Sequence, residues 1–319
     1  MLYCFVSSWV IGCAYLLGVA LSIVGVMKVL ILHGNVVSRN SEELVEASRG
    51  QGHEVIYGQT AEVSSEVSQS GSRFWLKEAE VSDFDVCLLR SFGPGSCEQL
   101  TRRISMIEHM EISGIRVVNP CYAFRRARDK YATQYTLEAA DLPIPITYTT
   151  ESLADAYRVS EQYGDFIYKP ILSSMGKGSL RFSDPDLSYN AYKMLDRFGQ
   201  PLILQKYVPN PGRDVRVFVI GDAVVGSAYK YRAKGKWKTN VAQGGRMVEE
   251  KVSDEILELG LRATRAMGLD YSGVDIIESP DGPVILEVNG SPGWQALNLA
   301  ANINVADEIV KYAVGLVHG

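Results

Sequence analysis

The chain has 319 residues, of which 46% are hydrophobic and 22% are charged. This length supports a large core and roughly two domains. The formal net charge of −5 argues against a nucleic-acid partner, although local charge clusters could still bind a small anion. None of the five cysteines forms a C-x-x-C pair, which indicates reduced thiols and a cytoplasmic protein.

Residues 1–26 carry no charge and are rich in apolar side chains. Their length would suit a membrane span, and a signal peptide fits less well because no Lys or Arg precedes the apolar run. Met27 opens an apolar run without any linker, so a span ending at Val26 would press the first core strand against the headgroups. We therefore interpret residues 1–26 as an upstream leader from a misassigned start codon, with a membrane anchor as the alternative.

Strands and helices alternate over residues 27–119. Strands are expected at 29–32, 54–57, 85–89 and 115–118, with helices from Asn40 or Ser41 to Gly50 and over 98–113. Residues 58–80 are polar and predict a long loop containing one short element. The pattern predicts a βαβ-type N-terminal domain over 27–119. No G-x-G-x-x-G follows the first strand, so it does not indicate a dinucleotide site.

The second half of the chain predicts two further subdomains, over 120–207 and 208–319. In the first, helices are expected at 129–140, 152–163 and 186–199, with strands at 144–148, 166–169, 179–182 and 202–207. In the second, one hairpin is expected over 215–229, a capped amphipathic helix over 254–267 and another hairpin over 273–289.

The last hairpin predicts a metal site. Its strands flank the turn sequence Ser279-Pro280-Asp281-Gly282, and a hairpin centred on Asp281 sets Asp275 opposite Glu287. Two opposed carboxylates repel each other unless a cation lies between them. Period two places the apolar residues Val274, Ile276, Leu286 and Val288 on one face and the oxygen donors Asp275, Glu287 and Asn289 on the other. This donor set suits Mg²⁺; a solvated hairpin with incidental acids is the alternative.

Two further patterns indicate anion binding. Lys169 ends a strand and enters a loop of small residues, 173–178, whose N–H groups could approach phosphate oxygens. On the strand that follows Pro209, Asp214 and Arg216 share a face that Arg213 does not, and guanidinium groups there could bind carboxylate or phosphate. The alternatives are a hairpin loop with incidental lysines and a salt-bridged sheet surface.

These patterns occur in an order that resembles the ATP-grasp superfamily, and within it the RimK-type amino-acid ligases. The resemblance runs from about residue 119 to 315, with a weaker preceding domain. It is carried by Lys130, Lys169 with the loop 173–178, the segment 205–208, Arg213-Asp214-Val215-Arg216, the segment 238–245, Gly273-Val274-Asp275, and Glu287-Val288-Asn289 with the four residues after it. It implies an α/β chain with the ATP-grasp fold, two α+β subdomains gripping ATP, behind a Rossmann-like pre-ATP-grasp domain.

The resemblance also implies roles for individual residues. Lys130 and Lys169 would contact the ATP phosphates, and Lys177 could add a charge there. Adenine would meet the backbone of Gln205, Lys206, Tyr207 and Val208, while Asp214, Lys238 and Thr239 would complete the nucleotide site. Arg216, Arg232 and Asn240 would face the acyl phosphate and the incoming amino acid, and Asp275, Glu287 and Asn289 would bind two Mg²⁺ ions, for which Mn²⁺ could substitute.

The implied activity is ATP-dependent ligation of L-glutamate to a carboxylate through an acyl phosphate. The segments 209–214 and 229–240 look most similar to the methanopterin-type glutamate ligases of the family, so the expected acceptor is a small tetrahydromethanopterin-type cofactor. A protein tail, a deazaflavin coenzyme, a phosphotransferase reaction and a non-catalytic nucleotide-binding module are the alternatives. A homo-oligomer is expected, with no nucleic-acid partner.

Overall fold

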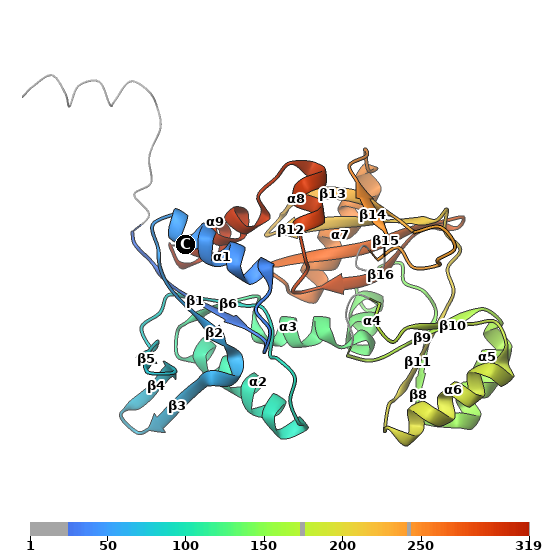
Figure 1. The fold of residues 1–319 in the computed structure, drawn as a ribbon, viewed down its shortest axis with the longest axis horizontal. Coiled ribbons are helices and arrows are strands. Elements are labelled where there is room, and N and C mark those ends of the chain that lie inside the picture. Colours follow the sequence, from blue (N-terminus) through green and yellow to red (C-terminus); the bar gives the residue numbers. More distant parts are fainter. Residues whose placement is uncertain (1–24, 173–175, 241–243, 319) are drawn as a thin grey trace, which may run out of the picture.

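The computed structural model describes residues 25–172, 176–240 and 244–318. Our interpretation of residues 1–26 as a leader therefore falls almost entirely outside the described residues. Within those residues, no helix is both long enough and apolar enough to cross a bilayer. The described chain forms three main sheets, each covered by helices (Figure 1).

The N-terminal sheet is parallel and has the order β2-β1-β6-β7. Its strands are β1 (Lys28–His33), β2 (Glu54–Gln59), β6 (Val86–Leu89) and β7 (Arg116–Val118). Alternate β1 residues enter two separate cores, so both faces are covered, as a continuous apolar strand requires. Helix α1 (Arg39–Gly50) packs into one core and α2 (Cys97–Ile112) into the other. This is the arrangement expected of a Rossmann-like domain.

Our prediction of a long loop over residues 58–80 was wrong. The segment contains a short 3₁₀ helix, η1 (Thr60–Glu62), and an antiparallel meander of β3 (Val63–Ser68), β4 (Gly71–Leu76) and β5 (Ala79–Glu80). Val63, Phe74 and Leu76 are buried in the core beside α2, whereas the Ser and Glu residues form the solvated face. The polar composition therefore reflected one face of a small sheet.

The central sheet is antiparallel, in the order β10-β9-β11-β8. It contains β8 (Thr147–Thr150), β9 (Phe166–Lys169), β10 (Leu180–Phe182) and β11 (Leu202–Lys206), with α5 (Leu153–Tyr163) and α6 (Pro185–Arg197) packed together on it. The predicted strand 144–148 begins only at Thr147, because Pro143 and Pro145 have no N–H to donate to a ladder. This lobe extends away from the other two sheets (Figure 1).

The C-terminal sheet is antiparallel, in the order β14-β13-β12-β15-β16. Its strands are β12 (Arg213–Ile220), β13 (Ala223–Tyr231), β14 (Arg246–Val248), β15 (Tyr271–Ser279) and β16 (Gly282–Asn289). Helix α7 (Asp254–Met267) covers one face, with Ser253 as its N-cap and Gly268 in the left-handed conformation at its end, as the sequence predicts.

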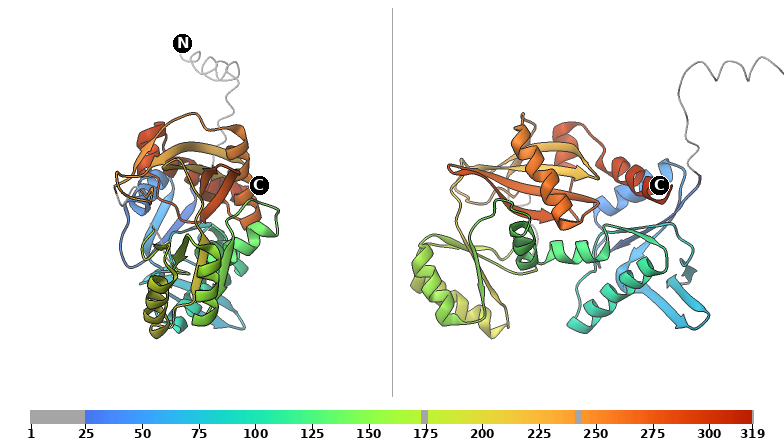
Figure 2. Two further views of the ribbon diagram at one scale, coloured as in Figure 1. Left: turned by 90° about the vertical axis from the view of Figure 1, so that its right-hand side faces the viewer. Right: turned by 180° about the vertical axis from the view of Figure 1, so that it is seen from behind.

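The helices do not pack only within the three domain ranges that the sequence predicts (27–119, 120–207 and 208–319). The helix expected over 129–140 is α4 (Lys130–Glu138), with Asp129 as its N-cap, and it is preceded by α3 (Cys121–Arg128), which the sequence analysis did not predict. Both helices contribute to the core of the C-terminal sheet. After the short α8 (Gln295–Ala301), the last helix, α9 (Val305–His318), returns to the N-terminal sheet and lies beside α1 (Figures 1 and 2). The domain ranges therefore stay a prediction.

Candidate active site

The first cavity lies between the central and C-terminal sheets. Both sheets are antiparallel, and their facing strands β9, β11, β12, β13, β15 and β16 all supply residues to its wall. Of the predicted site residues it gathers Lys130, Lys169, Gln205, Lys206, Tyr207, Val208, Asp214, Lys238, Thr239, Asn240, Asp275 and Glu287. A set spread over more than 150 positions of sequence is thus brought to one place between the central and C-terminal sheets.

The hairpin of β15 and β16 has the predicted pairing at the carboxylates. Asp275 lies opposite Glu287 and Val274 opposite Val288. The turn end differs from prediction, because Ser279 pairs with Gly282 and the register shifts by one residue between Asp275 and Ile276. Ile285 consequently occupies the core face, and Leu286, which we predicted there, lines the cavity beside Glu287.

Asp275 is buried and already paired with two cations. Arg216 grips it in a bidentate fork, with Nε at 2.6 Å from Oδ1 and Nη2 at 2.9 Å from Oδ2. Lys230 Nζ lies 2.9 Å from the same Oδ2 and 2.9 Å from Asp214 Oδ1. Burial by itself would raise the pKa of Asp275, but Arg216 and Lys230 outweigh it and hold the pKa at about 2. Asp275 therefore stays ionised at every physiological pH.

Glu287 and Asn289 are differently placed. Among the described residues, the Glu287 carboxylate has no hydrogen-bond or ion-pair partner, although it is half-buried and faces the cavity. Asn289 donates its Nδ2 to the carbonyl of Gly273 at 3.3 Å, which leaves its side-chain oxygen available as an acceptor. No cluster of three or more His, Cys, Asp and Glu residues suited to a metal occurs in the described chain. The oxygen set of Glu287 and Asn289, extended by Asp275, still fits a hard cation.

Two half-buried lysines stand across from these oxygens. Lys169 Nζ donates to Gln205 Oε1 at 2.5 Å. Burial lowers its pKa from 10.5 to about 8, against the opposing effect of Glu287, and burial also lowers the pKa of Lys130. The ammonium groups of these lysines have lost part of their hydration shell. An anionic ligand would therefore stabilise their charged form.

Part of the first cavity's lining is apolar. Ile167, Ile277 and Leu286 line it beside the segment from Gln205 to Val208. The N–H groups of Lys206 and Tyr207 already donate to the carbonyls of Ile146 and Asp165, at 2.9 and 3.0 Å. The Val208 N–H has no such partner in the described chain, so it is the donor left for a planar ligand at this edge. Asp214 accepts a short hydrogen bond from Thr239.

A family model described as the RimK-like ATP-grasp domain matches residues 127–313. The chain belongs to the RimK-like ATP-grasp family. The predicted resemblance and fold are thereby confirmed, and the protein is an ATP-dependent ligase.

Related proteins support this membership. The chain is 32% identical over 279 residues to the tetrahydromethanopterin:alpha-L-glutamate ligase of Methanosarcina acetivorans, covering 78% of this chain and 86% of that protein. It is 29% identical to a probable alpha-L-glutamate ligase of Haemophilus influenzae, covering 90% of this chain and 97% of that one. The solved structure of the ATP-grasp ligase PsnB with a phosphomimetic variant of its minimal precursor, Mg and ADP superposes with a TM-score of 0.72 at 22% identity, over 91% and 98% of the two chains.

Four predicted residues of this ATP-grasp chain lie outside the first cavity wall, and one of them, Lys177, is exposed and lines neither cavity. Arg216 is next to it, held on Asp275. Asn289 lines a second cavity that adjoins the first. Arg232 is exposed and packs against the backbone of Gly212, so the structure does not bring it to either cavity. Part of the loop 173–178 and residues 241–243 lie outside the described residues, although Lys238 Nζ reaches the Gly176 carbonyl at 2.7 Å.

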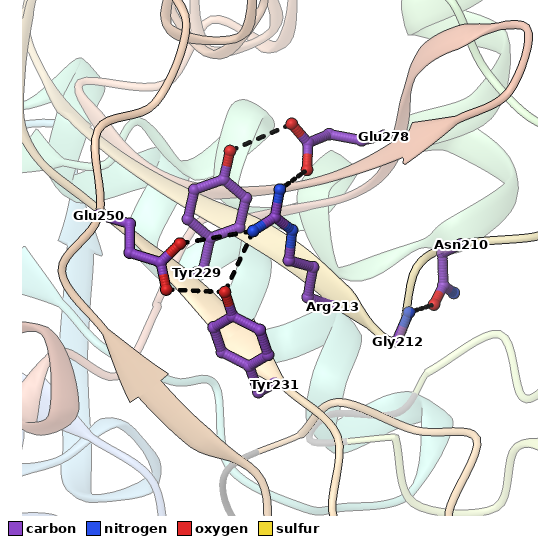
Figure 3. Close-up of polar contacts among 7 residues, drawn as sticks. All are labelled: Asn210, Gly212, Arg213, Tyr229, Tyr231, Glu250 and Glu278. Atoms are coloured by element: carbon purple, nitrogen blue, oxygen red, sulfur yellow. Dashed lines mark hydrogen bonds and ion pairs between the residues drawn. The ribbon is translucent and has the colours of Figure 1, made fainter.

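Arg213 lies on the strand face opposite Asp214 and Arg216, as predicted. It stacks over the Tyr229 ring at 4.0 Å and pairs with Glu278 at 3.1 Å and Glu250 at 3.4 Å (Figure 3). It also donates to the Tyr231 hydroxyl at 3.1 Å. These contacts connect β12, β13 and β15 with one another and with Glu250, which follows β14. Arg213 therefore has a structural role.

Lys230 is a site residue that the sequence analysis missed. Extending the β12–β13 register outward from the Gly221-Asp222 turn would set Tyr229 opposite Asp214. A register shift between Phe218 and Val219 sets Lys230 there instead. Burial opposes the charge on Lys230, but Asp214 and Asp275 outweigh it and raise its pKa. Trp237, which also lines the first cavity, was not predicted either.

Proposed function

We propose that this ATP-dependent ligase joins L-glutamate to a carboxylate of a small, tetrahydromethanopterin-type cofactor. Two relatives named tetrahydromethanopterin:alpha-L-glutamate ligase, from Methanosarcina acetivorans and Methanocaldococcus jannaschii, are 32% and 33% identical and overlap 78% and 72% of this chain. The observation that carries the proposal is the Glu287 carboxylate, which has no hydrogen-bond or ion-pair partner among the described residues and lines the same cavity as the half-buried Lys130 and Lys169 and the apolar Ile167 and Ile277. A nucleobase suits the apolar residues, and phosphates suit the lysines.

Individual residues of the chain would have separate roles in this reaction. Lys130 and Lys169 would neutralise the phosphates of ATP, and the Val208 N–H would orient the base. Glu287, Asn289 and Asp275 would hold Mg²⁺, which supplies charge neutralisation on the triphosphate. Arg216 and Lys230 position Asp275, and Asn240 stands in the same wall. The proposal includes two Mg²⁺ ions at these oxygens, for which Mn²⁺ would substitute.

The reaction then follows from charge. A carboxylate oxygen of the acceptor attacks the γ-phosphorus, the bond to the β-phosphate oxygen breaks, and ADP leaves. The neutral amine of glutamate attacks the resulting acyl phosphate; an amide forms, inorganic phosphate leaves and the amine loses a proton. Preorganised cations at Lys130 and Lys169 would stabilise the negative charge that develops in both steps.

A substrate panel tests the proposal. The purified protein would be incubated with ATP, Mg²⁺ and L-glutamate, together with tetrahydromethanopterin, a deazaflavin coenzyme or a protein-tail peptide, and products would be scored by mass. We expect tetrahydromethanopterin to gain the mass of one or more glutamyl residues, with one phosphate released for each. Glutamylation of the peptide alone would reverse the order of acceptors, and an amine-independent phosphorylated product would indicate a phosphotransferase.

A protein-tail acceptor is the second candidate. This chain covers 97% of the probable alpha-L-glutamate ligase of Haemophilus influenzae, a name that states no acceptor and is therefore compatible with a protein tail. This chain covers less of the Methanosarcina acetivorans enzyme, 86%, but is more similar to it, at 32% identity against 29% for the Haemophilus influenzae protein. We rank the cofactor first because its relatives are more similar to this chain.

A further inference from the structure

The second cavity lies between the N-terminal sheet and β16. One wall is formed by residues at the carboxyl ends of β1 and β6, including His33, the last residue of β1, and Arg90, which follows β6. The other wall contains Arg128 at the end of α3, with Glu287 and Asn289 of β16. In sheets of parallel strands, ligands commonly bind outside the carboxyl ends, because loops and helix N-termini converge there. The N-terminal turn of α1 also lines this cavity, at Ser38, Asn40 and Ser41.

The two cavities share a small set of residues. Lys130, Lys169, Gln205, Leu286 and Glu287 line both. The apolar residues Ile167 and Ile277 line only the first cavity, whereas Arg128 lines only the second. The shared lysines and Glu287 therefore lie between the place for a nucleobase and Arg128. If phosphoryl transfer occurs at the shared residues, a ligand in the second cavity extends from the reacting centre toward Arg128.

The lining of the second cavity carries a strong excess of positive charge. Arg90, Arg128, Lys130 and Lys169 line it, and Glu287 is the one carboxylate among its lining residues in the described chain. The chain as a whole has a net charge of −5, so this excess is local. The N-terminus of α1 adds a partial positive charge. Such a surface attracts an anionic ligand.

Arg128 differs from Arg90 and Lys169 in this wall because its guanidinium donates no hydrogen bond within the described residues. Arg90 donates to the Tyr271 hydroxyl and the Pro292 carbonyl, both at 2.9 Å, and Lys169 donates to Gln205. Within the described residues, Arg128 makes no hydrogen bond or ion pair, and burial alone lowers its pKa. Its guanidinium lies 5.3 Å from the centre of the Phe92 ring. Stacking on a ring keeps a guanidinium oriented while its in-plane N–H groups stay available to a carboxylate.

We infer that Arg128 binds a carboxylate that does not react, on a substrate held in the second cavity, and so selects for that charge. The inference rests on the proposed ligase function and names the substrate chemistry of the same site. The reacting carboxylate must meet the γ-phosphate at the shared residues, so the carboxylate on Arg128 is a second one. It belongs either to the incoming glutamate or to the acceptor, and kinetics distinguish the two.

The test uses the full chain with Arg128→Gln, Arg128→Lys and, as the matched control, Arg125→Gln. Arg125 lies on the same helix but is exposed and lines neither cavity. Initial rates would be measured while ATP, glutamate and acceptor are varied in turn. We expect Arg128→Gln to raise the KM of one carboxylate substrate by about tenfold or more, the usual effect of losing a charge-assisted hydrogen bond. The KM for ATP should not change, and Arg128→Lys should recover part of the loss.

The substrate whose KM rises identifies the source of the carboxylate. If it is glutamate, the preference for glutamate over glutamine should also collapse in Arg128→Gln. Unchanged KM values for both carboxylate substrates, or an equal rise for ATP, would overturn the inference, as would the same effect in Arg125→Gln.

A binding measurement separates this inference from the proposed function. Glutarate, a dicarboxylate without an amine, should raise the melting temperature of the wild-type chain and of Arg125→Gln in the presence of ADP and Mg²⁺, but not that of Arg128→Gln. If this pattern holds while no glutamate is ligated, the proposed function fails and the inference stands. No rise in the wild-type chain, or an equal rise in Arg128→Gln, overturns the inference even if glutamate is ligated.

Discussion

Two carboxylates of the hairpin differ in how they are held, although they face each other across one ladder. Asp275 neutralises Arg216 and Lys230, whereas Glu287 has no partner in the described chain. A carboxylate that neutralises buried cations contributes to folding, and one that faces a cavity without a partner is available to a ligand. Substitution at the two positions should therefore separate stability from activity.

Glu287→Gln should leave the protein nearly as stable as the wild type, within about 0.5 kcal/mol, because no hydrogen bond or ion pair within the described residues is lost. Its ATP-dependent ligation should fall by on the order of 100-fold or more if this oxygen helps to hold the cation. Urea denaturation and phosphate release measure the two effects. Unchanged turnover would refute the assignment of Glu287 to the metal.

Asp275→Asn should destabilise the fold as well as abolish ligation. It leaves the buried charges of Arg216 and Lys230 without their shared counter-charge, which costs about 3–5 kcal/mol. The free energy of unfolding, from the same urea titration, is the measurement. A stability equal to that of Glu287→Gln would show that the two carboxylates are equivalent.

Lys169 should make nucleotide affinity depend on pH. Burial lowers its pKa from 10.5 to about 8, so it is a cation below that pH and neutral above it. The KM for ATP should therefore rise above pH 8, by up to about tenfold per pH unit. The unfolded chain binds more protons between pH 8 and 10.5, so the lysine's contribution to stability increases over that range. Lys169→Arg should give a flat KM profile, and an equally steep profile in that variant would exclude Lys169 as the cause.

At the scale of elements, the C-terminal sheet depends on the close approach of α7 to β12. A Cβ at Gly260 would lie 2.6 Å from Cγ1 and 2.9 Å from Cβ of the fully buried Val217. Gly260→Ala should therefore cost about 1–3 kcal/mol despite the better helix propensity of Ala. Gly50→Ala in α1 is the control, because no atom lies within 4 Å of its Cβ position. Urea denaturation should show the loss in Gly260→Ala alone, and equal stability of both variants would contradict the packing.

At the scale of the whole molecule, α9 packs in one core with residues of the N-terminal and C-terminal sheets. One core contains Val29 and Ile31 of the N-terminal sheet, Phe218 and Tyr271 of the C-terminal sheet, and Ile309 of α9. Asn119 reinforces this junction by donating to the carbonyls of Tyr271 and Gly290, at 2.9 and 2.7 Å. The N-terminal and C-terminal sheets should therefore unfold together.

Ile309→Ala tests this junction. The side chain is fully buried, so the substitution should cost about 2–5 kcal/mol, whereas Val317→Ala at an exposed position of the same helix should cost less than about 0.5 kcal/mol. Circular dichroism and tryptophan fluorescence should report one coincident transition in each variant. Two separated transitions would mean that the sheets fold independently.

Much of the site was determined by the sequence itself. Strand periodicity and a turn signature led to the correct pairing of Asp275 with Glu287, although a register shift beside Asp275 was needed to offset the different turn, and the order of Lys130, Lys169 and Asp214 ahead of that hairpin identified the family. These features are local or depend only on order along the chain, so they can be predicted from residue types and their spacing.

Other features were decided only by tertiary structure. Single-residue register shifts placed Lys230 beside Asp214 and turned Leu286 toward the cavity, and no residue type marks such a shift in advance. The packing of α9 on α1 and the exposed place of Arg232 depend on contacts between distant segments. The place of Arg128 in the second cavity, without a hydrogen-bond or ion-pair partner among the described residues, is of the same kind, because it depends on which distant segments the fold brings beside it.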